Sequence, residues 1–111
     1  MSTDPTELVM AAAETPGDRT LAKDAVRAAL KILAAKAPGH SVEVRVPPYG
    51  AVQAVEGPRH RRGTPPNVIE ATPEAFLALA TGKITFSDAV ASGSVQASGP
   101  RADLTDHLPL I

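Results

Sequence analysis

The sequence predicts an α+β fold, with an antiparallel or mixed sheet of about five strands that helices cover on one face. Three observations lead to this prediction. Residues 20–37 have the apolar spacing of a helix, residues 42–46 alternate apolar and polar side chains, and residues 73–92 form two short helical stretches separated by Gly82. The chain has 111 residues, enough for one hydrophobic core.

The first segment, residues 1–18, is expected to be a short helix or a loosely attached arm. Asp4 is suited to cap a helix, Pro5 to its first position, and Glu7 to the position three residues after the cap. The segment holds four acidic residues and no basic residue, so both forms stay open. Residues 19–111 are expected to form a single domain.

A longer helix is predicted from near Thr20 to the Pro38–Gly39 step, which ends it. Its charged residues gather on one face, and apolar residues cover roughly half of the circumference. A sheet is the expected partner of this wide apolar surface. The charged face holds Lys23, Asp24, Arg27 and Lys31.

Four segments have the alternation or the turn boundaries of strands: residues 42–46, 51–57, 67–71 and 94–98. The connections between the first three are short and rich in glycine and proline. Such connections favour antiparallel pairing of those three strands.

Two short helices are predicted between the third and fourth of these segments. Thr72 is the expected cap of the first helix and Gly82 its end, and Thr85 or Ser87 caps the second. Phe86 and Val90 are expected to point inward. One more helical turn is predicted near the end of the chain, around Leu104 and Leu108.

The composition narrows the classes of function. The net charge of −1 argues against nucleic-acid binding. The chain has no cysteine, which excludes disulfides and thiolate chemistry. No apolar run approaches the roughly 20 residues of a membrane span, and the first residues lack the pattern of a secretory signal. A cytoplasmic protein is the resulting expectation.

The sequence offers no pattern of catalytic residues. His40, His60 and His107 lie far apart, without the spacing of metal ligands. There is no Gly-x-Ser-x-Gly turn and no glycine-rich phosphate loop. We therefore expect no catalytic site, no metal and no cofactor.

A basic cluster, RHRR, lies in a loop at residues 59–62. One interpretation is a solvated turn. The other is a contact of Arg59, Arg61 and Arg62 with a lipid headgroup or an anionic membrane, worth about 1 kcal/mol for each basic residue near the surface.

The stretch AFLALATGK, residues 75–83, is followed by a short helix and then by a strand that Gly93 introduces and SGP, residues 98–100, closes. This order of motifs resembles the sterol carrier protein family, most closely over residues 66–108. The resemblance implies a small α+β domain that encloses an apolar cavity for fatty acyl chains, sterols or related lipids. Val95 and Ala97 are smaller than the side chains usual there, which changes the expected size of the ligand.

The leading hypothesis is a lipid-binding or lipid-transfer protein without catalytic activity. The ligand is expected between the sheet and the helices of residues 73–92, where burial of each methylene contributes about 0.8 kcal/mol. The predicted lining residues are Val44, Val46, Val52, Phe76, Leu79, Ile84, Phe86, Val90 and Leu108.

Two alternatives stay open. The same apolar residues also suit a tightly packed core, in a domain that forms homodimers or binds another protein. Domains of this family also occur as appendages of enzymes, which would need a polar constellation that the sequence does not display.

Overall fold

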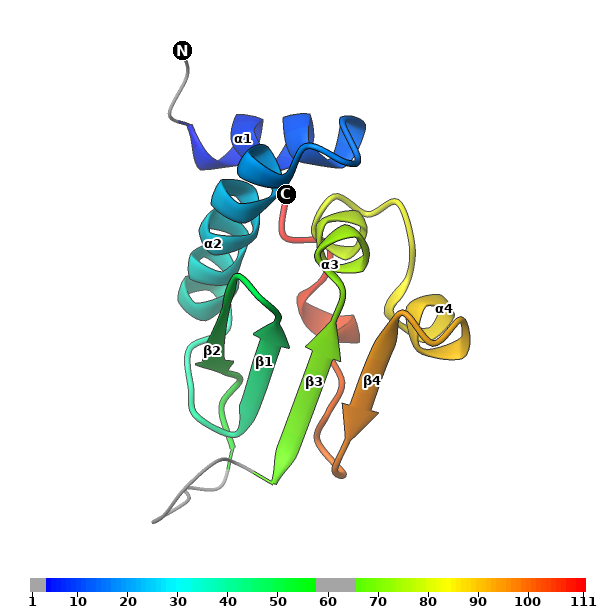
Figure 1. The fold of residues 1–111 in the computed structure, drawn as a ribbon. Coiled ribbons are helices and arrows are strands. Elements are labelled where there is room, and N and C mark those ends of the chain that lie inside the picture. Colours follow the sequence, from blue (N-terminus) through cyan, green and yellow to red (C-terminus); the bar gives the residue numbers. More distant parts are fainter. Residues whose placement is uncertain (1–3, 58–65) are drawn as a thin grey trace.

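The computed structural model describes residues 4–57 and 66–111. Helices and strands alternate irregularly along the chain (Figure 1). The elements are α1 (Pro5–Glu14), α2 (Arg19–Lys36), β1 (Val42–Val46), β2 (Gly50–Ala54), β3 (Asn67–Ala71), α3 (Pro73–Ala80), α4 (Phe86–Ala91), β4 (Val95–Ser98) and the 3-10 turn η1 (Thr105–His107).

The described strands form one mixed sheet of four strands in the order β2-β1-β3-β4. The α+β class is confirmed, whereas the predicted number of about five strands was too high. β1 pairs antiparallel with β2, and β3 pairs antiparallel with β4. β3 pairs parallel with β1, so the antiparallel pairing predicted for the first three strands was wrong at this step. β2 ends and β3 begins beside Val42, the first residue of β1, and β3 therefore runs alongside β1 in the same direction.

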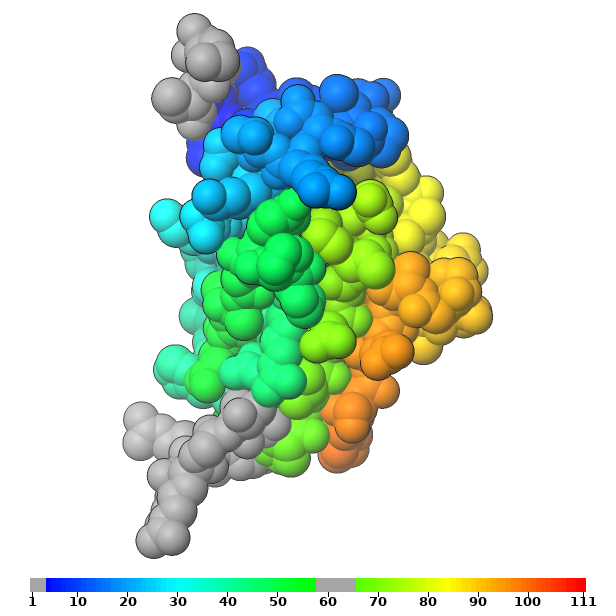
Figure 2. Space-filling view, viewed as in Figure 1, coloured from blue at the N-terminus to red at the C-terminus, as the bar shows by residue number. Residues whose placement is uncertain are grey.

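Helices cover one face of the sheet. α2 and the segment that follows β4 lie behind the strands in Figure 1. In the same view in Figure 2 the strands themselves form the surface, with no helix in front of them. This uncovered face carries the polar half of the alternation, including Glu43, Arg45 and Glu70, and the Arg45 Nε donates a hydrogen bond to the Glu43 carboxylate.

The core lies between the sheet and α2. Val42, Val44 and Val46 alternate into it from β1, as the two-residue period predicts. The buried side chains of α2 are small or aliphatic, and they let the helix lie close to the strands. They are Ala25, Val26, Ala29, Leu30 and Leu33.

Within the first segment, residues 5–14 form the helix α1. The Asp4 carboxylate caps α1 by accepting a hydrogen bond from the Thr6 amide at 2.9 Å. Val9 and Ala12 are buried, and α1 packs against both α2 and α3.

Thr72 and Thr85 cap the two short helices. The Thr72 hydroxyl accepts a hydrogen bond from the Ala75 amide, and that of Thr85 from the Asp88 amide, each at 3.1 Å. The expected inward orientation of Val90 is wrong, since this side chain is 38% exposed. α4 buries Phe86 and Ala89 instead, which places Val90 on the outer side of this six-residue helix.

The last residues pack back against α3. The predicted final turn is the 3-10 turn η1. The amides of Leu110 and Ile111 both donate to the Ala80 carbonyl, at 3.0 and 3.2 Å. The Lys36 Nζ donates to the Pro109 carbonyl at 2.8 Å. These bonds fix the C-terminal segment beside the end of α3.

None of the described helices combines the length and the hydropathy that crossing a bilayer requires. Arg59, Arg61 and Arg62 lie outside the described residues, so the predicted headgroup contact stays a prediction.

Candidate functional site

A groove of about 210 Å³ lies between the end of α3, the start of α4 and the C-terminal segment. Four of the residues predicted to line a ligand site meet around it: Leu79, Ile84, Phe86 and Leu108. The remaining lining residues are Gly82, Thr85, Thr105 and Pro109.

The local structure explains why these side chains converge. Gly82 has φ +76°, a conformation that favours glycine, and it turns the chain out of α3 toward Ile84 and α4. Phe86 is the first residue of α4 and is buried. The bonds of Leu110 and Ile111 to α3 hold the segment that carries Leu108 against the groove.

The groove is apolar, and none of the described residues that line it has an ionisable side chain. Its two hydroxyl groups are engaged elsewhere: Thr85 caps α4, and the Thr105 hydroxyl donates to Asp103 Oδ1 at 2.5 Å. Hydrogen bonds from the Thr105 hydroxyl and amide lower the pKa of Asp103, which lies outside the groove. This lining favours hydrocarbon over a polar ligand.

Other predicted lining residues belong to the core. Val44 and Val46 have no exposed surface, and Phe76 is 1% exposed. No void large enough for a water molecule therefore adjoins Val44 or Val46. The space between β1 and the helices is filled by side chains, and the groove lies at the margin of this layer.

Val52 and Val90 lie away from the groove. Val52 is half-buried on the edge strand β2, opposite Val44. Val90 is on the outer side of α4. The structure thus brings together Leu79, Ile84, Phe86 and Leu108, but not Phe76, Val90 or the residues predicted from the sheet.

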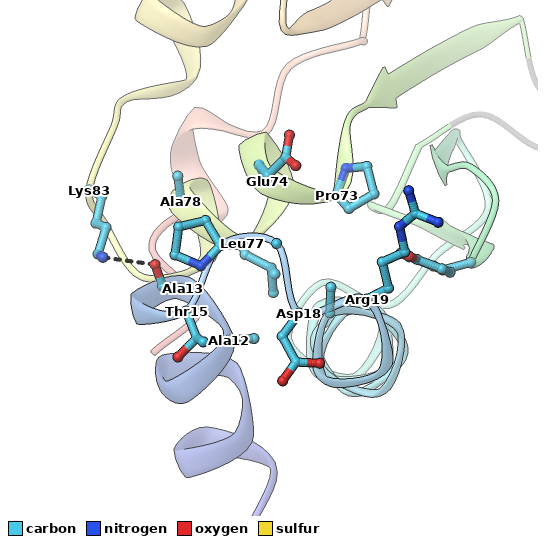
Figure 3. Close-up of a pocket in the computed structure, with 14 residues that line it drawn as sticks. Ala12, Ala13, Thr15, Asp18, Arg19, Pro73, Glu74, Leu77, Ala78 and Lys83 are labelled. Atoms are coloured by element: carbon cyan, nitrogen blue, oxygen red, sulfur yellow. Dashed lines mark hydrogen bonds between the residues drawn. The ribbon is translucent and has the colours of Figure 1, made fainter.

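A second and larger hollow, of about 370 Å³, lies where α1, α2 and α3 meet (Figure 3). The sequence did not predict this hollow, because its walls come from segments that lie far apart in the sequence and meet only in the folded protein. The nearest signal is the alanine content of these helices, since small side chains leave space between them. The lining residues are Ala12, Ala13, Thr15, Pro16, Gly17, Asp18, Arg19, Ala22, Tyr49, Pro73, Glu74, Leu77, Ala78 and Lys83.

Lys83 closes one end of this pocket. Its Nζ donates to the Ala13 carbonyl at 3.1 Å and lies 2.8 Å from Glu14 Oε1. The hydrogen bond and the charge of Lys83 lower the pKa of the Glu14 carboxyl. The basic group is thereby engaged with α1.

The histidines in the described part of the chain do not approach one another as ligands. His40 Nδ1 lies 3.0 Å from Gln53 Oε1, and His107 belongs to η1. Within residues 4–57 and 66–111, no three histidine, aspartate or glutamate side chains are grouped as a metal site.

No curated protein matches the chain significantly. A family model described as "Bacterial SCP ortholog" matches residues 18–110, which include α2, all described strands, α3, α4 and the groove. The match covers most of the chain and agrees with the resemblance of residues 66–108. The chain belongs to the sterol carrier protein family.

Proposed function

We propose that the protein binds an acyl chain or a similar apolar ligand in the groove of Leu79, Ile84, Phe86 and Leu108. The observation that carries the proposal is the convergence of these four side chains, from three segments, around one uncharged hollow. Membership of the sterol carrier protein family supports a role in binding or transferring lipids.

The volume of the groove limits what it holds in this conformation. Ligand pockets commonly measure about 300–1,000 Å³, and the groove measures about 210 Å³. It therefore takes part of a chain, with about 0.8 kcal/mol gained for each methylene that is buried. A longer ligand requires α4 or the C-terminal segment to move outward.

The proposed role is binding without catalysis. General acid–base chemistry needs a titratable group within hydrogen-bond reach of the reacting atoms. The eight residues that line the groove contain none. A ligand held there meets hydrocarbon side chains and two hydroxyls that already have partners.

Native mass spectrometry of the purified protein, with lipid extraction, tests the proposal. We expect a co-purified lipid in the wild type and its loss in Leu108→Glu, because the new carboxylate would be desolvated by the ligand. Val90→Glu makes the same chemical change on an exposed surface, and it should retain the lipid. Absence of lipid from the wild type, together with no uptake of added fatty acid, contradicts the proposal.

A role in protein association is the second candidate. Val90 and Ala97 are both exposed apolar residues, and Ala97 belongs to β4, an edge strand of the described sheet. An edge strand offers unpaired backbone groups to another chain. Sedimentation analysis that finds a dimer weakened by Ala97→Lys, in protein that binds no lipid, would favour this candidate.

A further inference from the structure

The pocket between α1, α2 and α3 is separate from the groove, because the two share no lining residue. Its volume of about 370 Å³ lies in the range of about 300–1,000 Å³ that small-molecule sites occupy. Ala12, Ala13 and residues 15–17 of its wall precede the range that matches the family. α1 and the turn after it, which precede the matched range, thus supply part of the wall of the pocket.

The floor of the pocket is apolar. Leu77 points from α3 into the space between α1 and α2 in Figure 3. Ala12 lines it from α1, Ala22 from α2 and Ala78 from α3. Since three of these four side chains are methyl groups, a ligand can approach the helix backbones closely.

Most charged groups around the pocket already have a structural role. Asp18 Oδ1 accepts a hydrogen bond from the Leu21 amide at 3.0 Å and caps α2. Lys83 is bound to Ala13 and Glu14. Glu74 lies in the first turn of α3, where a negative charge is stabilised by the helix dipole.

Arg19 is different. Among the described residues it has no partner in a hydrogen bond or an ion pair, and its guanidinium lies at the rim of the pocket on the side of Pro73 (Figure 3). It also lines a neighbouring hollow of about 520 Å³ with Thr20, Lys23, Pro48 and Tyr49. Arg19 and Tyr49 belong to both hollows, which therefore adjoin.

The neighbouring hollow adds a second basic group that has no hydrogen-bond or ion-pair partner within residues 4–57 and 66–111. Lys23 lies one helical turn after Arg19 on the same face of α2. Arg27, one turn further, donates from Nε to the Tyr49 carbonyl at 3.1 Å and holds the β1–β2 turn against the helix. Arg19 at the rim and Lys23 in the adjoining hollow thus stand beside a pocket with an apolar floor, whose wall also holds the Asp18 and Glu74 side chains.

We propose that this pocket is a second binding site, which takes a small amphiphilic anion. The carboxylate or phosphate of the ligand pairs with Arg19 and Lys23, and its short apolar group lies against Leu77 and the surrounding alanines. Arginine suits this task because its planar fork of donors matches both types of anion. The site does not depend on occupancy of the groove.

Site-resolved NMR titration of the whole chain with sodium octanoate tests the proposal. Octanoate should shift the resonances of Ala22, Leu77 and Ala78. Arg19→Gln should weaken this response by about tenfold, as expected for loss of a charge-assisted hydrogen bond. Lys31→Gln, a matched change on α2 away from the pocket, should leave the affinity unchanged.

Titrations with other ligands and with two further variants identify which part of the ligand the pocket recognises. Octyl glucoside, which has the same chain with a neutral head, and acetate, which has the head without the chain, should both bind more weakly than octanoate. Ala78→Phe should block the response by filling the pocket, whereas Ile84→Trp in the groove should preserve it. Vesicles that contain an anionic phospholipid show whether a membrane lipid supplies the same chemistry in place of a free ligand.

Two results would overturn the proposal. One is that octanoate leaves the resonances of Ala22, Leu77 and Ala78 unshifted, whether or not it shifts the resonances of the groove. The other is equal affinity of Arg19→Gln and the wild type at these resonances. If octanoate shifts the resonances of Ala22, Leu77 and Ala78 but not those of Ile84 and Leu108, the result supports the second site and contradicts binding in the groove.

Discussion

Lys83 ties the loop between α3 and α4 to the end of α1: its Nζ lies 2.8 Å from Glu14 Oε1 and 3.1 Å from the Ala13 carbonyl oxygen. A cation at the C-terminal end of a helix is favourable because the last carbonyl groups carry partial negative charge. α1 has no basic residue in its own last turn. Lys83 supplies that charge from the family domain.

Replacing Lys83 should loosen α1 without unfolding the protein. In Lys83→Met we expect faster hydrogen exchange at the amides of the last turn of α1. The free energy of unfolding should change little, because the pair is solvent-exposed. Hydrogen exchange and urea unfolding measure the two quantities. Lys31→Met on α2 is the control, and equal exchange in both variants would contradict the expectation.

The same pair should make the attachment of α1 dependent on pH. Lys83 lowers the pKa of Glu14 below its ordinary value of 4.5. Because the pKa of Glu14 is lower in the folded state, the pair contributes fully to stability at pH values above 4.5. This contribution is lost as the pH falls through the lower, folded-state pKa. NMR titration of the Glu14 carboxyl should therefore give a midpoint below 4.5 in the wild type and a return toward the ordinary value in Lys83→Met. An identical midpoint in the two proteins would show that the pair does not form.

Asn67 joins three segments and should be important for stability. Its Nδ2 donates to the Ser41 carbonyl at 2.8 Å, and its Oδ1 accepts from the Arg101 amide at 2.9 Å. Asn67→Ala should lower the free energy of unfolding by about 1–3 kcal/mol, because the buried Ser41 carbonyl and the part-buried Arg101 amide lose their partner. Urea unfolding checks this, with Gln96→Ala on the exposed face of β4 as the control. A loss no greater than that of the control would refute the assigned role.

Gly99 should tolerate a side chain less well than Gly93. Both have positive φ, +104° and +83°, so alanine is strained at either position. At Gly99 the added Cβ would also lie 2.5 Å from Asn67 Oδ1, whereas at Gly93 it would meet nothing within 4 Å. Gly99→Ala should cost at least about 1 kcal/mol more than Gly93→Ala. The added Cβ would lie 2.6 Å from the Pro66 carbonyl oxygen as well. Thermal or urea unfolding of the two variants measures the difference, and equal losses would mean that both the Asn67 side chain and the backbone at Pro66 adjust freely.

Local sequence patterns predicted individual elements well. The alternation of residues 42–46 marks β1, and Thr72 with Pro73 marks the start of α3, because strand period and helix capping depend on neighbouring residues. The pairing of β1 with β3 was missed, since a period identifies a buried face but not the neighbouring strand. Val90 was misplaced because a six-residue helix is too short for its inner face to be read from spacing alone.

The two hollows were predictable to different degrees. Leu79, Ile84, Phe86 and Leu108 were found from their apolar character and from the family resemblance, and the structure brings them together. Val44 and Val46 carry the same apolar signal, yet they fill the core. The pocket at Arg19 needs α1, α2 and α3 in their folded places, so no single stretch of sequence contains it.

The most direct test of the central claim is the dissociation constant of a fluorescent fatty acid for the wild type, Ile84→Trp and Val90→Trp. Both variants gain the same bulky side chain, one in the groove and one on the exposed side of α4. The groove account predicts binding by the wild type, a Kd raised at least about tenfold in Ile84→Trp, and a Kd within about twofold of the wild type in Val90→Trp. Equal affinity of all three proteins, or no binding by the wild type, would contradict it.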